Sequence, residues 1–402
     1  MTRPLPADPV IRELVQQARR HQLSRRQVLA GAGIGASALA LAACSAPAAD
    51  LKPATDDSAS DKSLVWANWP DYIDVDDAKK HPTLEKFTQQ TGIKVDYRED
   101  VDDNNTYYAK VRDQLIKGAD IGADTVCLTE WMVARLVKGG YVQELDKKNI
   151  PNAKNLVSTL ADPDFDPGRA HSLPWQGGFA GIAWNTEQVG ELKSVSDLWS
   201  SELAGRVGVL SEMRDTIGLI LLEQGVDISG EKWGADEFGK AMDEFSKQLK
   251  NKQIRNVKGN SYTEDLANGD TLAAICWSGD ITLLNGEVGY EKFKFVIPES
   301  GGTIWNDTFV VPVGSTKKTN AETLMNYYYE PEVAAEVAAY VNYVTPVAGA
   351  AEAAAAIDPA LAENQLIFPN DETLKTVHPF RTLSAEEDQA FTQEFQRALL
   401  GA

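Results

Sequence analysis

The chain has 402 residues, 43% of them hydrophobic, and its 59 acidic and 39 basic side chains give a formal net charge of −20 at pH 7. This length can fill two hydrophobic cores, so we expect two domains. The acidic balance argues against the basic stripes on which nucleic-acid binding depends, and we expect no nucleic-acid partner. A cationic partner fits this charge, although acidic surfaces also serve solubility alone.

The N-terminal segment, residues 1–43, has the pattern of an export signal. Arg25 and Arg26 precede an apolar run that is rich in Gly and Ala and too short to span a membrane comfortably. The arginine pair resembles the twin-arginine signal of bacteria, and the sequence LAAC that ends at Cys44 resembles a lipobox. We therefore expect export by the twin-arginine route, lipidation of Cys44 as a membrane anchor on the extracytoplasmic face, and a flexible tether over residues 44–62. A buried Ala-rich helix with an incidental cysteine is the alternative interpretation.

Strand and helix patterns alternate from Ser63 onward. Alternating apolar residues predict strands, and apolar residues three or four positions apart predict helices. The predicted order is strand 63–69, helix 83–92, strand 93–99, helix 107–118, strand 123–128, helix 130–140 and a short edge strand at 141–146. This alternation is typical of an α/β domain with a mainly parallel sheet.

A second α/β series follows a loop at 161–170. It is predicted to contain two neighbouring strands within 171–185, the segments 194–205 and 206–210, helices 216–224 and 234–250, and the segments 271–277 and 293–298. Residues 301–315 then predict a strand that returns to the first sheet. Helices follow within 321–341, at 349–356, and from Ser384, where the sequence SAEE makes a capping box.

The chain is predicted to cross twice between two lobes, near residues 172 and 303. We therefore divide it into a first lobe at 63–172, a second lobe at 173–303, and a segment 304–402 that returns to the first lobe and adds the C-terminal helices. Both lobes would then be discontinuous or hinged.

The sequence offers little for catalysis or metal binding. Cys127 and Cys276 each lie in an apolar strand-like run, which favours free buried thiols over a disulfide, and no cysteine spacing is typical of a metal site. No nucleophile elbow, P-loop or HExxH motif is present. We therefore expect no enzyme, metal or cofactor. Because paired carboxylates can hydrolyse glycosides, a glycosidase is the alternative from the enzyme class.

Six blocks of sequence carry a resemblance to one family. They are VWANWPDYI, FTQQTGIKVDY, GGYVQELD, SVSDLWSSELAGRVGVL, LANGDTLAAICWSGD and PESGGTIWNDTFVVP, and they follow the family's order over residues 63–380. Together they resemble the periplasmic spermidine/putrescine-binding proteins of ABC importers. The resemblance implies the type II solute-binding fold, in which two α/β lobes enclose a ligand cleft. It also implies a polyamine ligand and an ABC permease as partner; a sugar receptor and a purely structural surface lipoprotein are the alternatives.

A polyamine is a flexible alkyl chain that carries ammonium groups, so its receptor needs aromatic faces along the methylenes and carboxylates at the nitrogens. The resemblance places both kinds of residue in the cleft. The implied ligand-binding residues are the aromatic Trp69, Tyr72, Trp131, Trp277, Trp305 and Tyr343, the acidic Glu212, Asp215, Asp280 and Asp307, and Thr129, which stands where the family often has serine. Asp71, between two of these aromatic residues, is a further candidate.

The spacing supports several of these roles apart from the resemblance. Trp69, Trp277 and Trp305 end predicted strands, where open α/β sheets present side chains to a crevice. Asp280 and Asp307 each follow one of these tryptophans closely, and a charge on a strand between lobes needs a cationic partner. Tryptophans that fill the cores of the lobes are the alternative.

Some positions depart from the family's pattern. Pro70 replaces a hydroxyl residue after the first tryptophan and removes a backbone N–H. Phe380 or Arg381 takes the place of the glutamine that contacts the polyamine in spermidine binders, and a positive Arg381 would disfavour the far end of spermidine. For Asp215, an ion pair with Arg214 or Arg206 is the competing explanation. The sequence therefore leaves the preferred polyamine open.

Overall fold

The computed structural model describes residues 51–401 of the chain. The expected twin-arginine signal and the lipidation site at Cys44 lie outside the described residues. None of the helices within that range combines the length and the hydrophobicity that a membrane span requires. Cys127 and Cys276 are buried and unpaired, which confirms the prediction for both thiols.

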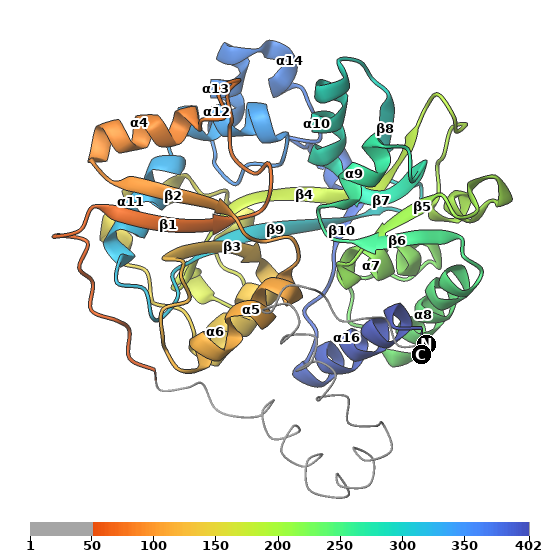
Figure 1. Ribbon diagram of the computed structural model, residues 1–402, viewed down its shortest axis with the longest axis horizontal. Coiled ribbons are helices and arrows are strands. Elements are labelled where there is room, and N and C mark those ends of the chain that lie inside the picture. The colour runs from red at the N-terminus through yellow and green to blue at the C-terminus, as the bar shows by residue number, and fades with distance from the viewer. Residues whose placement is uncertain (1–50, 402) are drawn as a thin grey trace, which may run out of the picture. The chain divides into compact units, whose positions relative to one another are not determined.

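One continuous sheet runs through both lobes (Figure 1), with its strands in the order β2-β1-β3-β9-β4-β7-β5-β6. The first lobe contributes β1 (Ser63–Asn68), β2 (Lys94–Glu99) and β3 (Thr125–Thr129). Strand β1 is parallel to both of its neighbours. This part of the sheet therefore has the parallel arrangement that the alternating pattern predicts.

The second lobe repeats this arrangement with its own strands. They are β5 (Val207–Leu210), β6 (Ile254–Lys258), β7 (Ala273–Trp277) and β8 (Phe293–Val296). Strand β5 is parallel to β6 and β7, and a three-residue strand, β10 (Val377–Pro379), pairs with β9. Strand β6 was not predicted from the sequence, because its residues IRNVK mix apolar with charged and amide side chains.

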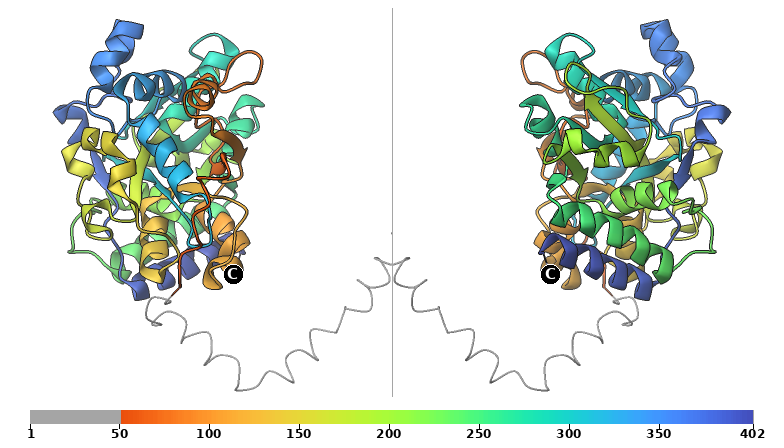
Figure 2. Two further views of the ribbon diagram at one scale, coloured as in Figure 1. Left: turned by 90° about the vertical axis from the view of Figure 1, so that its left-hand side faces the viewer. Right: turned by 90° about the vertical axis from the view of Figure 1, so that its right-hand side faces the viewer.

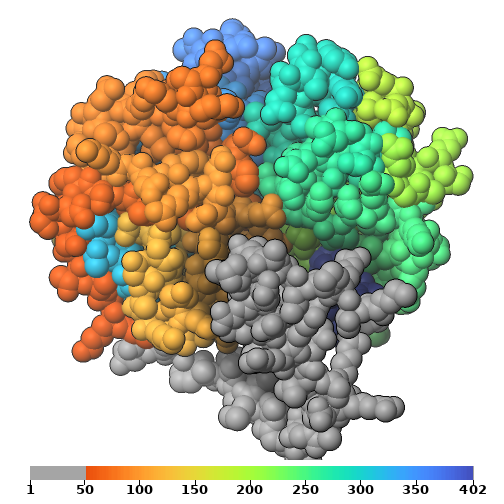
Figure 3. Space-filling view, in the orientation of Figure 1, coloured from red at the N-terminus to blue at the C-terminus, as the bar shows by residue number. Residues whose placement is uncertain are grey.

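Strands β4 (Ser172–Asn185) and β9 (Gly302–Val310) join the lobes and pair antiparallel with each other. Strand β9 reaches β3 in the first lobe, and β4 ends against β7 and β8 in the second. These are the two crossings expected near residues 172 and 303. In Figure 3 the red-to-yellow residues of the first lobe and the green residues of the second accordingly occupy opposite sides.

The expectation of two strands within 171–185 is wrong, because β4 is a single strand of 14 residues. Gly177 and Gly178 interrupt its apolar pattern without breaking it. A Cβ atom on Gly178 would lie 2.6 Å from the ring of Trp305 and 2.7 Å from that of Tyr343. These contacts show that the glycine allows close approach of two aromatic rings rather than a turn.

Helices cover both faces of the sheet in each lobe (Figures 1 and 2). Before β4 the chain forms α4 (Pro82–Thr91), α5 (Asn104–Ile116) and α6 (Glu130–Gly139). Between β4 and β9 it forms α7 (Met213–Glu223), α8 (Ala235–Lys250), α9 (Tyr262–Ala267) and α10 (Ser278–Val288). After β9 come α11 (Lys318–Tyr328), α12 (Pro331–Val341), α13 (Ala350–Ile357), α14 (Pro359–Ala362), α15 (Asp371–Leu374) and α16 (Ala385–Leu399).

The C-terminal helix α16, one of the helices that the sequence adds after the return to the first lobe, packs on the second lobe. Phe391 of α16 stacks on Phe238 of α8 with ring centroids 3.9 Å apart, and Phe395 stacks on Phe245 at 5.1 Å. Burial of this apolar stripe holds the helix there. The predicted capping box at Ser384 is present.

Residues 51–62, the described part of the expected tether, are hydrogen-bonded to the first lobe. The backbone N–H of Ala54 donates to the carbonyl of Val313 at 2.9 Å. Lys317, just before α11, forms ion pairs with Asp57 and Asp61. The expectation of a flexible tether as far as residue 62 is therefore wrong for residues 51–62. Acidic side chains in this stretch bind Lys317 and the N-terminus of α11.

One predicted strand is absent from the structure. Residues 141–146 form no strand, and only an isolated bridge joins Val142 to Pro312. Residues 194–205 contain two short 3-10 helices, Val195–Trp199 and Ser201–Leu203. The stretch at 141–146 has only six residues, two of them acidic and one an amide, which is too little apolar alternation to specify a strand.

Candidate ligand-binding cleft

A cavity of about 410 Å³, partly open to solvent, lies between the lobes. It is lined by Trp69, Pro70, Tyr72, Asn104, Thr129, Glu212, Asp215, Asn260, Trp277, Asp280, Trp305, Asp307 and Tyr343. Ten of the twelve residues proposed from the sequence as ligand-binding are therefore brought together, and the other two, Asp71 and Trp131, do not line the cavity.

The sheet positions these residues through its strand ends. Trp69 directly follows β1, Thr129 ends β3, and Trp277 ends β7. Glu212 caps the N-terminus of α7, shortly after β5. Since these strands run parallel within each lobe, their carboxyl ends open into one crevice, as in other open α/β sheets. Trp305 and Asp307 instead lie on the crossing strand β9.

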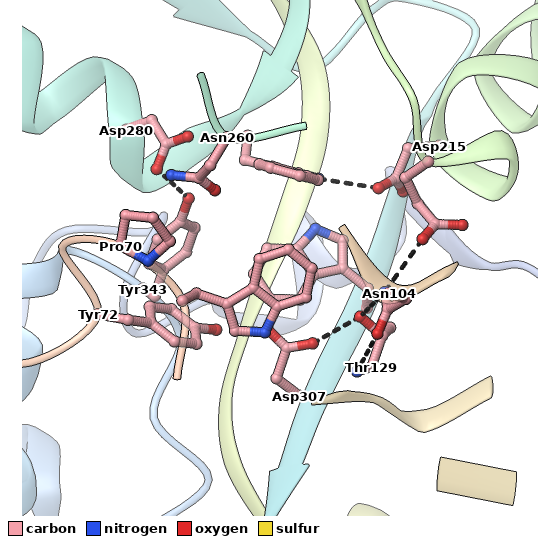
Figure 4. A pocket seen from close by; sticks show the side chains of 13 residues that line it. Pro70, Tyr72, Asn104, Thr129, Asp215, Asn260, Asp280, Asp307 and Tyr343 are labelled. Atoms are coloured by element: carbon pink, nitrogen blue, oxygen red, sulfur yellow. Dashed lines mark hydrogen bonds between the residues drawn. The ribbon is translucent and has the colours of Figure 1, made fainter. Parts of the chain in front are cut away.

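Asp280 lies at one side of the cavity, in the first turn of α10 (Figure 4). Its carboxylate accepts hydrogen bonds from the hydroxyl of Tyr262 at 2.8 Å and from that of Tyr343 at 2.6 Å. Burial raises the pKa of Asp280 to about 6, and the two tyrosine hydroxyls oppose that rise. The low-polarity surroundings therefore disfavour an unpaired negative charge here.

Asp215 lies across the cavity from Asp280 (Figure 4). It accepts hydrogen bonds from the indole N–H of Trp277 at 2.8 Å and from the hydroxyl of Thr303 at 2.5 Å. Burial raises its pKa, while these two donors and Arg214 lower it. Its closest partners are thus neutral donors, so the competing explanation of a simple ion pair with Arg214 does not describe its contacts.

Asp307 lies below both of these carboxylates in the view of Figure 4. The hydroxyl of Thr129 donates to it at 2.7 Å, and the side-chain amide of Asn104 donates to the Thr129 oxygen at 2.8 Å. Burial raises the pKa of Asp307 to about 7. The Thr129 hydroxyl thus orients a carboxylate that lines the cavity.

Glu212 is the fourth carboxylate of the cavity. It accepts a hydrogen bond from the side-chain amide of Asn104 at 3.1 Å, and its Oε1 lies 4.0 Å from Nη1 of Arg214. Burial raises its pKa to about 8 although Arg214 acts in the opposite direction. Asn104 therefore links Glu212 on the second lobe to Thr129 on the first.

Aromatic rings form a connected wall beside the carboxylates. Trp277 contacts Trp69 and Trp305 edge to face, each with ring centroids 6.2 Å apart. Tyr343 contacts Trp305 and Tyr72 in the same way, both at 5.4 Å. All except Trp305 are nearly buried, so the wall presents ring surfaces from which water is largely excluded.

The remaining candidates lie elsewhere. Asp71 is exposed and has a positive φ of 53°, with its backbone N–H bonded to Glu99. Trp131 packs beneath the guanidinium of Arg214, 4.0 Å from its ring centroid. Arg381 pairs with Glu387 at 2.6 Å and neither it nor Phe380 lines the cavity.

The sequence analysis missed Asn104 and Asn260. Asn104 is buried in the first turn of α5, whose start was predicted three residues too late. The N-cap residue Asp103 was the available signal for the true start. Asn260 follows β6, and it escaped notice because that strand itself was missed.

Two α/β lobes joined by two crossing strands, with a cavity at their strand ends, have the architecture of a solute-binding protein. The family model for bacterial extracellular solute-binding proteins matches residues 83–365, and the chain belongs to that family. Such proteins bind solutes rather than transform them, which agrees with the expectation that the chain is no enzyme.

Known relatives extend over most of the chain. It is 29% identical over 347 residues to the spermidine/putrescine-binding periplasmic protein of Escherichia coli K12, covering 85% of this chain and 90% of the relative. It is also 29% identical to the putrescine-binding periplasmic protein SpuD of Pseudomonas aeruginosa, covering 86% of this chain and 94% of SpuD.

Solved structures confirm the type II fold. PotD of Streptococcus pneumoniae superposes with a TM-score of 0.66 at 24% identity, over 84% of this chain and 98% of PotD. The Tp0655 lipoprotein of Treponema pallidum superposes with a TM-score of 0.68 at 22% identity, over 84% of this chain and 98% of Tp0655.

Proposed function

We propose that the chain is an extracytoplasmic substrate-binding protein that holds a polyamine, putrescine or spermidine, in the cleft between its lobes. It would deliver this ligand to the permease of an ABC importer. The observation that carries the proposal is a set of four buried carboxylates, Glu212, Asp215, Asp280 and Asp307, around one aromatic-walled cavity. The names of the relatives from E. coli and P. aeruginosa agree with this ligand class.

The electrostatics of the cavity favour an organic dication. Burial raises the pKa of all four carboxyl groups, because charge without a partner is costly in a poorly hydrated space. Ammonium groups would supply the missing partners. The tryptophan and tyrosine faces would cover the methylenes between them, and a ring face near an ammonium contributes about 0.5–2 kcal/mol.

The energy available from so small a ligand sets a demanding condition. Putrescine has about six heavy atoms, and the best small ligands gain at most about 1.5 kcal/mol per heavy atom, or about 9 kcal/mol in total. Micromolar affinity needs about 8 kcal/mol. The cleft must therefore contact nearly every atom, with a carboxylate at each amine and a dry slot between them.

Titration calorimetry tests the proposal directly. We expect binding heat with putrescine or spermidine, no turnover, and no heat with hexoses. Binding of a sugar would support the alternative solute class, and formation of a product would refute the assignment as a receptor. A thermal-shift screen of the same compounds provides the control, because a ligand that binds the folded state raises the melting temperature.

We also propose that Cys44 is lipidated after export by the twin-arginine route, which would hold the protein at the extracytoplasmic face of the membrane. The support is the sequence pattern around Arg25, Arg26 and Cys44. Cys44→Ala should move the protein from the membrane fraction to the soluble fraction without a change in ligand affinity. Retention of this variant in the membrane fraction would contradict the anchor.

A further inference from the structure

A short turn just before α5 of the first lobe is seated in a notch of the second lobe. The backbone N–H groups of Asn260 and Ser261 donate to the carbonyl and the carboxylate of Asp102, at 3.3 and 3.4 Å. The hydroxyl of Ser211 donates to the carboxylate of Asp103 at 2.7 Å. We call this set of hydrogen bonds the rim contact. It joins the lobes through segments that follow β5 and β6 in the second lobe and β2 in the first.

The rim contact lies between the cavity and solvent. Asp102 is exposed and Asp103 is half-buried, whereas the next residue, Asn104, is buried and lines the cavity. On the second lobe, Glu212 and Asn260 line the cavity at the same place. A ligand on its way to the buried carboxylates must pass between the lobes. The rim contact can therefore break when a ligand enters and form again behind it.

Gly259 makes the rim contact possible because it has no Cβ atom. A Cβ here would lie closer to the backbone oxygen of Asp102 than the 3.0 Å that real Cβ atoms keep, and its three nearest atoms would all belong to Asp102. The obstacle is backbone of the other lobe, which no side-chain rotation can move aside. Gly259 is not among the residues with a positive φ, so its own backbone conformation accepts alanine.

We propose that Gly259 is a positioning residue for ligand retention: it lets the turn at Asp102 seat on the second lobe, so that the closed cleft holds the ligand. This inference rests on the proposed function and adds the residue that limits closure. A methyl group at this position leaves the carboxylates and rings of the cavity in place, but it stops the lobes short of the rim contact. The apparent affinity then falls, because it scales with the population of the binding-competent state.

The deciding experiment measures the rate constants of putrescine binding to the wild type and to Gly259→Ala by stopped-flow tryptophan fluorescence. Because closure retains the ligand, the dissociation rate constant of the variant should rise at least about tenfold, and the association rate constant should stay within about threefold. Gly190→Ala is the matched control. Gly190 also lies in the second lobe outside any helix, has no positive φ, and a Cβ there would meet no atom within 4 Å. Its rate constants should stay within about twofold of the wild type.

Small-angle X-ray scattering adds a readout that a purely local defect would not change. Putrescine at saturating concentration should reduce the radius of gyration of the wild type and of Gly190→Ala. The reduction should be smaller for Gly259→Ala, because its lobes cannot approach as closely. An equal reduction in Gly259→Ala would contradict a limit on closure.

Ser211→Ala tests the rim contact from a second position. It removes the donor to Asp103 without adding an atom, and Ser211 does not line the cavity. Its dissociation rate constant should rise about threefold to tenfold, as expected for the loss of one hydrogen bond to a charged group.

The outcomes separate this inference from the proposed function. A wild-type dissociation rate in Gly259→Ala, or in Ser211→Ala if the first variant does not fold, would overturn the role of the rim contact while leaving polyamine binding intact. An equal rise in Gly190→Ala would overturn it as well. If neither putrescine nor spermidine binds the wild type, the proposed function fails and this inference fails with it.

Discussion

Polyamine affinity should depend strongly on pH, because the cleft carboxyl groups must ionise to pair with ammonium groups. The pKa values of Asp280 and Asp307 are raised to about 6 and about 7. The ligand nitrogens stay charged up to pH 8, since alkylammonium groups have pKa values near about 10. At low pH, binding must therefore first remove protons from the protein.

The size of the effect follows from these two pKa values. At pH 5 both groups must lose a proton before they can pair with the ligand, which should weaken binding about 1000-fold relative to pH 8. Asp280, with a pKa of about 6, accounts for about tenfold of this loss. Asp307, with a pKa of about 7, accounts for about 100-fold. At pH 6 binding should release about 1.4 protons per ligand. Calorimetry in buffers with different ionisation enthalpies measures both quantities, with Asp307→Asn as the variant that removes the larger step.

Without ligand, the free energy of unfolding should change with pH in the direction opposite to the ligand affinity. Both pKa values lie above the ordinary value, so between about pH 4 and pH 7 the folded state retains protons that the unfolded chain releases. The contribution of these groups to the free energy of unfolding therefore falls as the pH rises. The ligand-induced rise in melting temperature should grow over the same interval. A pH-independent affinity, or one that increases towards acid, would refute this reasoning.

Three further changes probe other parts of the structure. Trp277→Phe keeps a ring but removes the donor to Asp215, and should weaken putrescine binding by about 1.5–3 kcal/mol in a calorimetric titration. Gly178→Ala forces a methyl group against Tyr343 and should lower the free energy of unfolding by about 1–3 kcal/mol in urea. Phe391→Ala removes a nearly buried ring from α16 and should lower it by about 3–5 kcal/mol, with little change in affinity.

Each of these three predictions would be contradicted by a specific result. Wild-type affinity in Trp277→Phe would mean that the indole N–H does not orient the carboxylate of Asp215 for the ligand. If Gly178→Ala unfolds at the same urea concentration as the wild type, the crowding seen at β4 does not constrain the fold. Normal stability of Phe391→Ala would show that α16 contributes little to the second lobe. Gly239→Ala, on α8 where a Cβ would meet no atom within 4 Å, is a control for the glycine change.

Much of the fold could be predicted from local patterns. The strands around Trp66 and Cys127 are buried and apolar, and their alternation with amphipathic helices specifies a parallel α/β arrangement. The fold class and most helices follow from such signals. The continuity of β4 could not be predicted from the sequence. A pair of glycines such as Gly177 and Gly178 can mark a bend between two strands or a strand position against which an aromatic ring packs, and the sequence does not distinguish the two.

The site could be predicted in composition but not in geometry. The aromatic residues and carboxylates were identified by type, spacing and resemblance. Their surroundings depend on contacts distant in sequence, such as Arg214 with Trp131 or Asn104 with Glu212. No local pattern distinguishes a tryptophan that faces a cavity from one that is covered by an arginine. The packing of α16 on α8 was missed for the same reason, since an amphipathic helix does not specify its partner.

The pairing of β4 with β9 limits how the two lobes can move. Within residues 51–401, the two strands that link the lobes are hydrogen-bonded to each other as a ladder, so sliding one lobe past the other would break many bonds at once. Twisting and bending of a two-stranded ribbon preserve those bonds. The two lobes should therefore open and close by hinge bending about the β4–β9 ribbon. The aromatic rings and carboxylates on the two sides of the cavity would separate when the lobes open and approach each other when they close.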